Sequence, residues 1–593
     1  MPSKRKQYSS CDGCRRSRVA CNASQLGHQP GDSRWTGTCA RCTRLKQSCS
    51  FQWMSSAKEQ DRALPRTSRH HVPLAIESVN LDNPEIVNKD QLDSILMLWS
   101  DSILEHSFEP VLRLAIGYDS YPLVNNSNGI RVPYGIEVFN TLDEYEIKEM
   151  DHYDLSHERD GIAKRRKIDD RINQSLRTTI KAFTARWLPL ILNQASSQTD
   201  EVENATRKVW RAARNDMLKV MNRVSYRSVL TLLLFSQTPM PPGISEDEEE
   251  DGVSGLVCLH TALLHVQRLR EQHSSRQSRR LEAGVWTSTI TGPISGPSYT
   301  EEYLQLESRI YWAAVIWDTS NSVAFNLRAS LTSGLKGACL GPVWLLARAF
   351  LVGSFHQQTE NWRTNGFKVT DETAMRILSG AAVGNIYIWK TITSLKEALR
   401  EGVAEDSLLL TWRALRDAID VYQTSILPLI NVCERKIHYL DQECRLCWFE
   451  VSLKYHLGIL TITDAFKVAR RLDMLAQIGD LSQETESEIF NVLKFGVDSS
   501  YTIRCASERA SATGFDRTTQ TPCLMILTSV IAVHPLTSIV VDAVVLAQKT
   551  IVYKHSQGKI TDEVYSYLDS TLAKALGQLP KCSQHITLAR KGL

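Results

Sequence analysis

The chain has 593 residues, of which 42% are apolar and 23% are charged. This composition is typical of folded globular proteins and excludes wholly disordered and collagen-like classes. The net charge of +3 is unevenly placed, because residues 1–70 hold 14 Lys/Arg and 4 Asp/Glu and the remaining 523 residues carry a net −7. A basic head on a mildly acidic body indicates that the head binds a polyanion and the body does not.

Cysteine usage is equally uneven, since six of the 14 cysteines fall within residues 11–49. The chain starts with the polar stretch MPSKRKQYSS, which lacks the apolar core of a signal peptide. A secreted disulfide scaffold is therefore not expected, because thiols clustered in a reducing compartment more often bind metal.

The six clustered cysteines form two triplets with the same spacing, C-x2-C-x6-C. One tetrahedral zinc ion needs four ligands and would leave two cysteines idle. Two zinc ions need eight ligand positions, which six cysteines fill only if two of them bridge both metals. The repeat makes Cys11 and Cys39 the natural bridging pair. The predicted cofactor is two Zn²⁺ per chain, and the predicted metal ligands are Cys11, Cys14, Cys21, Cys39, Cys42 and Cys49.

Other metal arrangements fit the spacing less well. A RING-type cross-brace needs eight ligands in interleaved pairs, and His28 is the one further soft ligand inside the cluster. A single zinc ion with two spare cysteines leaves the duplicated spacing unexplained. His28 is not expected to be a ligand, because the six cysteines already fill the ligand positions.

Cations between the ligands indicate DNA binding. The repeat matches Arg16 with Arg44 and Arg18 with Lys46. Cations on a short, metal-fixed helix can enter a major groove, where an arginine binds guanine O6 and N7, and a basic N-terminal arm can bind phosphates or the minor groove. The alternative is a zinc-dependent module for protein contacts. The predicted DNA-binding residues are Arg15, Arg16, Arg18, Arg44, Lys46, Lys4, Arg5 and Lys6.

Three regions follow one another along the chain: a Cys-rich domain at 1–53, a linker at 54–90 and a body at 91–593. The linker is rich in polar residues and contains three prolines. The body shows apolar residues at helical spacing, so we expect a mostly α-helical fold. The predicted helical segments are 92–104, 176–192, 204–235, 256–271, 302–328, 374–400, 407–433, 442–466 and 535–552.

The longest apolar stretch, 523–547, is interrupted by His534, Pro535 and Asp542. These residues would be costly inside a bilayer, so the stretch favours a pair of buried helices over a membrane span. No run of 21–28 residues without proline follows Cys49 before the body, so a coiled coil next to the cluster is not expected. We therefore expect a monomer on DNA, while dimerisation through the body stays possible.

Two charge runs interrupt the body. Lys164, Arg165, Arg166 and Lys167 form a basic block that predicts a nuclear import signal, with an exposed helix start or loop as the alternative. Residues 246–251 are all acidic and follow a Pro/Gly-rich stretch, which predicts a solvated loop, with a partner-binding segment as the alternative.

The motifs CDGCRRSRVAC (11–21) and CARCTRLKQSC (39–49) resemble the fungal Zn2Cys6 binuclear cluster transcription factors. In that family Arg15 matches the usual arginine after the second cysteine, and Arg18 lies where a cation reads bases. Ser17 and Ala20 depart from the frequent basic residues, and the connector 22–38 is longer than usual. This connector, its Trp35 and the tail 49–56 are similar to the ethanol-utilisation regulator subfamily of filamentous fungi.

The segment SRIYWAAVIWDTSNSVAFNLRASL (308–331) resembles the fungal transcription factor middle homology region, which we place at about 176–350. Arg309, Tyr311, Trp312 and Asp318 match its pattern, whereas 326–329 departs from its usual ending. For Arg309 and Asp318 we expect a structural pair that ties helices together, with an effector site as the alternative.

The sequence thus predicts a nuclear, sequence-specific DNA-binding transcription factor. The resemblance implies a G-rich, CGG-like core read from the major groove, co-regulators or transcription machinery as partners, and activation of a metabolic pathway, of carbon utilisation or secondary metabolism. The alternative is an interaction or chromatin adaptor with nonspecific DNA contacts. No HExxH, P-loop or GxSxG motif is present, so an enzyme is not expected. The Cys444-x-x-Cys447 motif lies in an apolar helical stretch and predicts buried thiols.

Overall fold

The structure is a computed structural model that describes most of the chain. The described residues are 11, 14, 21–23, 37–47, 49–50, 89–117, 121–123, 135–153, 159–192, 199–250, 253–287, 300–331, 341–364, 366–505, 525–580 and 584–592. The chain divides into two compact units, 1–78 and 79–593. The predicted linker 54–90 lies outside the described residues except for its last two, which begin a helix.

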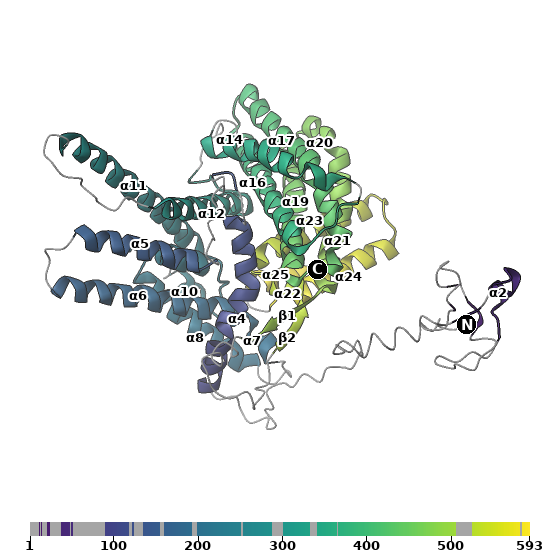
Figure 1. Ribbon diagram of the computed structural model, residues 1–593, viewed down its shortest axis with the longest axis horizontal. Coiled ribbons are helices and arrows are strands. Elements are labelled where there is room, and N and C mark those ends of the chain that lie inside the picture. Colours follow the sequence, from purple (N-terminus) through teal and green to yellow (C-terminus); the bar gives the residue numbers. More distant parts are fainter. Residues whose placement is uncertain are drawn as a thin grey trace. The chain divides into compact units, whose positions relative to one another are not determined.

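Helices dominate the large unit, which confirms the predicted mostly α-helical body (Figure 1). Those before residue 330 are α4 (Lys89–Ile116), α5 (Glu137–Tyr153), α6 (Arg159–Thr184), η2 (Ala185–Trp187), α7 (Leu188–Ile191), α8 (Thr199–Leu218), α9 (Tyr226–Ser236), α10 (Glu246–Glu250), α11 (Gly255–Thr287) and α12 (Glu301–Phe325).

The second half of the unit continues in the same manner and adds one pair of strands. Its elements are α14 (Pro342–Ala349), η3 (Phe350–Phe355), α15 (His356–Gln358), η4 (Glu360–Arg363), α16 (Asp371–Glu401), α17 (Glu405–Ser425), α18 (Leu427–Glu434), η5 (Ile437–Tyr439), α19 (Gln442–Val468), α20 (Leu472–Gln477), α21 (Gly479–Asp498), β1 (Ser500–Arg504), β2 (Met525–Ser529), α22 (Val530–Val533), α23 (Thr537–Ser556), α24 (Asp562–Gln578) and α25 (Gln584–Gly592).

The helices of the large unit form two groups that share one hydrophobic core. In the first group α5, α6, α8 and α11 pack against α9, whose residues 226–235 are all buried. In the second group α16, α21 and α23 pack against α19. Helix α4 contacts α6 and α12 on one side and α16 and α19 on the other, and Figure 1 shows it passing between the two groups.

Local sequence signals explain where the long helices begin and end. Thr370 caps α16 in a capping box with Thr373, and Gly402 ends this helix with a φ of 60°, a left-handed conformation that glycine adopts without strain. Asp441 caps α19 by accepting a hydrogen bond from the backbone N–H of Cys444. These capping groups satisfy N–H and C=O groups that a helix leaves unpaired at its ends.

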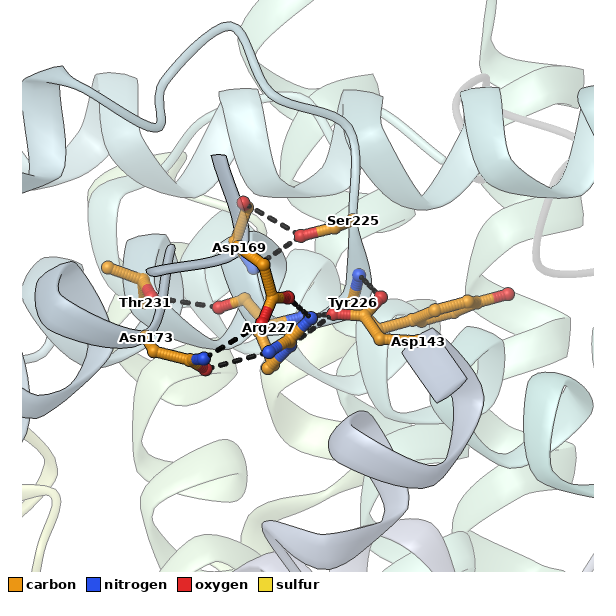
Figure 2. A network of polar contacts seen from close by, with 8 residues as sticks. Asp143, Asp169, Asn173, Ser225, Tyr226, Arg227 and Thr231 are labelled. Atoms are coloured by element: carbon orange, nitrogen blue, oxygen red, sulfur yellow. Dashed lines mark hydrogen bonds and ion pairs between the residues drawn. The ribbon is translucent and has the colours of Figure 1, made fainter. Parts of the chain in front are cut away.

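A buried arginine holds three elements of the first group together. Figure 2 shows the Arg227 guanidinium of α9 between Asp143 of α5 and two residues of α6. Its Nε donates to Asp143 at 2.7 Å, and its other nitrogens donate to Asn173 at 2.7 Å and to Asp169 at 2.5 Å. Asp143 also accepts from the backbone N–H of Tyr226, and these donors offset part of the burial that raises the pKa of its carboxyl.

The apolar stretch 523–547 forms two helices only after residue 529, because its first part is a strand instead of the predicted helix. Residues 525–529 form β2, which pairs antiparallel with β1 in the register Ser500–Ser529 to Arg504–Met525. One helical turn, α22, follows, and α23 starts only after Pro535, which interrupts the helix. The prediction failed because a partner strand far away in the sequence decides the conformation of 525–529.

Three further predictions need correction or refinement. The predicted segments 204–235 and 407–433 are each two helices, the second broken at Ile426 before Leu427 and Pro428. The acidic run is not a loop over 246–250 but the short helix α10, where Glu248 accepts two hydrogen bonds from Arg211. Helix α10 thus stays close to α8 because of this bidentate ion pair.

Within the part of the chain that the structure describes, no helix combines the length and apolar character that a membrane crossing needs.

Candidate metal centre

Four cysteine thiols meet in the small unit. Cys11, Cys14, Cys39 and Cys42 are all buried, and their sulfur atoms lie within 4.8 Å of one another. The Sγ of Cys11 is 3.8 Å from that of Cys39 and 3.6 Å from that of Cys42, and Cys14 Sγ is 3.6 Å from Cys39 Sγ. Four soft donors at this spacing could hold a metal ion.

The two halves of the motif build the same local turn. In the first half the backbone N–H of Cys14 donates to Cys11 Sγ at 3.5 Å. In the second half the N–H of Cys42 donates to Cys39 Sγ at 3.4 Å. Cys39 also caps the short helix α2 (Ala40–Arg44). The duplicated spacing in the sequence is therefore duplicated in the geometry, which is the arrangement of a metal knuckle.

The third cysteine of each triplet lies at the rim of this cluster. Cys21 and Cys49 are half-buried, and Cys49 Sγ accepts a hydrogen bond from the backbone N–H of Cys39 at 3.4 Å. The Cys21 thiol interacts with Cys39, and the Cys49 thiol interacts with Cys11. Each rim thiol thus reaches the first cysteine of the other triplet.

The electrostatics distinguish the first cysteine of each triplet from the others. Burial raises the pKa of all six thiols, but hydrogen bonds from the backbone and from neighbouring thiols outweigh it at Cys39, whose pKa falls to about 6, and at Cys11, whose pKa is also lowered. Burial raises the pKa of Cys14 to about 12 and that of Cys49 to about 11. The cluster therefore concentrates thiolate character on the two cysteines at its centre.

The second half of the motif presents cations beside the cluster. Arg44, at the end of α2, and Lys46, just after it, are exposed. Lys46 has a φ of 50°, and the N–H of Gln47 bonds to the carbonyl of Cys42, so the chain reverses directly after the helix. The predicted residues outside the described part of the chain are Lys4, Arg5, Lys6, Arg15, Arg16, Arg18, His28 and Trp35.

The basic block of the body lies on a helix. Lys164, Arg165, Arg166 and Lys167 are exposed on α6, well inside its bounds. Because consecutive residues point in different directions around a helix, these four exposed cations surround one turn of α6.

Arg309 and Asp318 stabilise two different chain segments. Arg309 is fully buried in α12, donates to the carbonyls of Ile116 and Gly117 at 2.9 and 2.8 Å, and lies over the Tyr121 ring. Asp318 accepts from the backbone N–H groups of 330 and 331 at 2.8 and 2.7 Å. The two residues thus act as two separate structural anchors, one in each half of α12, instead of one pair.

The Cys444-x-x-Cys447 motif is buried within α19. Burial raises the pKa of both thiols, and each thiol donates to a backbone carbonyl, Asp371 for Cys444 and Pro110 for Cys447. These are the properties of structural thiols.

A buried charged cluster of the body was missed from the sequence. Glu450 of α19 bonds to His534 at 2.6 Å and pairs with Lys454 at 2.5 Å, and all three side chains are largely buried. The contact joins residues 84 positions apart, so no local motif reveals it. The signals that were available are the i, i+4 spacing of Glu450 and Lys454 on one helix and the position of His534 inside an apolar stretch.

Comparison with known protein families, with curated proteins and with solved structures gives no match for this chain.

Proposed function

We propose that the chain is a nuclear, sequence-specific DNA-binding transcription factor whose N-terminal unit is organised by two zinc ions. The observation that carries the proposal is the two-fold thiol cluster. Cys11 and Cys39 lie at its centre, and each interacts with thiols of both triplets. This is the contact pattern required of two ligands that are shared between two metals.

The proposed ligand sets follow from the repeated spacing of the cysteines. One zinc ion takes Cys11, Cys14, Cys21 and Cys39, and the other takes Cys39, Cys42, Cys49 and Cys11. Bound zinc supplies the folding energy of a unit that has little apolar core of its own. The protein supplies the turns that aim the sulfur atoms and the N–H donors that stabilise their charge.

The cations next to the cluster support DNA as the partner. The short helix α2 is anchored by two thiols and ends in exposed cations, Arg44 and Lys46. A small rigid helix of this kind fits a major groove. By the repeat, Arg16 and Arg18 occupy equivalent positions in the first half, and the resemblance assigns base reading to Arg18. The resemblance also makes a G-rich, CGG-like core the target.

The large helical unit is proposed to regulate and not to catalyse. Its exposed basic block at 164–167 is proposed to direct nuclear import, and its partners are co-regulators or the transcription machinery. Activation of a metabolic pathway is the role that the resemblance implies.

Selection of bound sequences from a random DNA pool by the full chain tests the proposal. We expect enrichment of a G-rich core that disappears when zinc is chelated. Binding that depends on salt but enriches no sequence would instead support the nonspecific adaptor.

Two variants test the proposed DNA contacts of individual residues. Arg18→Ala should cost about 1–3 kcal/mol at the selected site and relax the preference for guanine. Arg16→Ala should weaken binding to all DNA sequences similarly, as the loss of a phosphate contact does. Equal weakening of selected and scrambled DNA by Arg18→Ala would contradict its base-reading role.

A further inference from the structure

The large unit contains a cavity of about 660 Å³. Residues from α9 of the first helix group and from α16, α19 and α23 of the second group line it, together with residues of α4, α12 and α25, so it lies where the two helix groups meet. Its size falls in the range of pockets that bind small molecules. Most of its wall is apolar, with Phe108, Leu112, Ile316, Trp317 and Ile386 among the contributing residues.

Two buried polar atoms of this wall, Ser320 Oγ and Asn385 Oδ1, lack a hydrogen-bond or ion-pair partner among the described residues, and Asn385 is the more deeply buried residue of the two. Asn385 of α16 is 1% exposed, and its Nδ2 donates to the carbonyl of Val451 at 2.7 Å. Its Oδ1 has no hydrogen-bond partner among the described residues, and Asn385 lines the cavity. Because buried polar atoms are almost always paired, this acceptor calls for an N–H or O–H donor from a molecule inside the cavity.

A donor lies on the same wall. Lys454 is one helical turn beyond Val451 on α19 and also lines the cavity. Its ammonium is 2.5 Å from Glu450 Oε1. An ammonium carries three N–H donors and this ion pair uses one of them, so Lys454 can also donate to a ligand oxygen.

The charges of the wall favour an uncharged ligand. Among the described lining residues, the charged ones are Glu450, Lys454 and Asp542. Glu450 and Lys454 neutralise one another, while Asp542 repels an anion and Lys454 repels a cation. A hydroxyl is the simplest neutral group that both donates and accepts a hydrogen bond through a single atom.

We propose that this cavity binds an uncharged, mostly apolar small molecule that carries a hydroxyl group. The hydroxyl, of an alcohol or a phenol, donates to Asn385 Oδ1 and accepts from Lys454. The apolar remainder packs against α4 and α12. Since α9 belongs to the first helix group and α16 and α19 belong to the second, a ligand that fills the cavity contacts both groups.

Direct binding to the zinc-loaded full chain tests the proposal without DNA. The probes are 2-naphthol, 4-hydroxybiphenyl and 4-cyclohexylphenol, each compared with its methyl ether, which keeps the acceptor and lacks the donor. Saturation-transfer NMR detects binding, and titration gives affinities. We expect at least one phenol to bind, about tenfold more tightly than its ether. No binding by any phenol, or equal binding of phenol and ether, would overturn the proposal.

Three variants locate the site. Asn385→Leu should lower the affinity for the phenol about tenfold and change the affinity for its methyl ether less than twofold. Ala382→Trp fills the cavity, because Ala382 lines it, and should abolish binding. Ala349→Trp places the same side chain at an exposed position outside the cavity and should leave binding unchanged. Binding that survives Ala382→Trp would place the ligand elsewhere. If the Asn385→Leu variant does not fold, the comparison of phenol and ether affinities for the unmodified chain still tests the role of the hydroxyl.

Discussion

Cys39 combines three roles in one residue. It caps α2, its thiolate accepts an N–H from Cys42, and its sulfur lies next to those of Cys11 and Cys14. The spacing of the cysteines alone predicted that these residues meet, because two-residue knuckles fix the geometry locally. The shift of the Cys39 pKa to about 6 could not be predicted from spacing, since it depends on which thiols surround it.

Replacing Cys39 is therefore expected to disturb both metals. The full chain should bind two zinc ions, Cys39→Ser should lose both, and Cys49→Ser, at the rim, should lose one and keep the other. Native mass spectrometry or elemental analysis of the purified chain measures this ratio. One zinc ion per unmodified chain, or one ion fully retained in Cys39→Ser, would contradict the shared-ligand arrangement.

Glu450 links the charge state of the core to pH. Burial alone would raise the pKa of its carboxyl, but Lys454 and His534 outweigh burial and lower the pKa to about 2. The folded chain thus holds this proton less tightly than the unfolded chain, whose carboxyl titrates near its ordinary value. The stabilisation of about 3 kcal/mol is complete above the ordinary pKa and is lost as pH falls toward 2.

We expect Glu450→Gln to remove this acid dependence. At pH 7 the variant should lose about 3–5 kcal/mol of unfolding free energy, because Lys454 is left without its partner. Its disadvantage should shrink as pH falls from 5 to 3, as the unmodified chain loses the same interaction. Urea unfolding at several pH values measures both effects, with exposed Glu563→Gln as the control. A constant difference between variant and unmodified chain would contradict the role of Glu450.

At the scale of elements, the long helices were predictable and their ends were less so. Apolar spacing identified α16 and α19 because each presents many buried residues at helical intervals. The strand β2 was mistaken for helix, since its pairing with β1 is non-local. The acidic run was mistaken for loop because a local signal was overlooked: Ser245 caps α10 by accepting from the backbone N–H of Glu248, and Arg211 of another helix then pairs with the Glu248 carboxylate.

Close packing of α16 and α19 depends on a glycine. A Cβ added at Gly458 of α19 would lie 2.8 Å from Trp389 Nε1 of α16, whose ring is held by a hydrogen bond to the carbonyl of Lys454. Gly458→Ala should therefore lower the unfolding free energy by about 1–3 kcal/mol.

A second glycine serves as the matched control for this prediction. Gly577, near the end of α24, has open space around its Cα. Gly577→Ala should be neutral or stabilise the chain by up to about 1 kcal/mol, because alanine is the better helix former. Urea unfolding compares the two variants. Equal effects of both substitutions would show that the α16–α19 contact tolerates a methyl group.

The exposed basic block on α6, residues 164–167, is the proposed nuclear import signal and can be tested by substitution. Replacing Lys164, Arg165, Arg166 and Lys167 by glutamine removes the positive charges without breaking the helix, since glutamine is a good helix former. We expect reduced nuclear accumulation of the fluorescently tagged chain, in part only, because the basic N-terminal arm offers a second signal. A variant that exchanges Lys and Arg within the block keeps the charge and should behave as the unmodified chain. Unchanged localisation of the glutamine variant would assign the block to ordinary surface.

At the scale of the whole molecule, a basic unit with a cysteine cluster that could hold a metal ion precedes a large helical unit. The charge difference between head and body, visible in the sequence, agrees with this division into two units. The cavity of the body could not be predicted, because its wall collects residues from α4 to α23 that are far apart in the chain. A coiled coil next to the cluster would have to begin within 51–88, and this segment lies outside the described residues. The absence of a coiled coil therefore stays a prediction from the spacing of the prolines.

That prediction determines the stoichiometry on DNA. Without a coiled coil to pair two clusters, residues 1–78 should bind one half-site as a monomer, and affinity should not depend on the spacing between two half-sites. Analytical ultracentrifugation of the complex gives the stoichiometry, and titration of probes with one half-site or two half-sites at varied spacing gives the affinities. The full chain is measured on the same probes. If its affinity depends on the spacing of the half-sites while that of residues 1–78 does not, residues 79–593 cause the dimerisation. A sharp optimum at one spacing for residues 1–78, with binding lost on a single half-site, would show an obligate dimer.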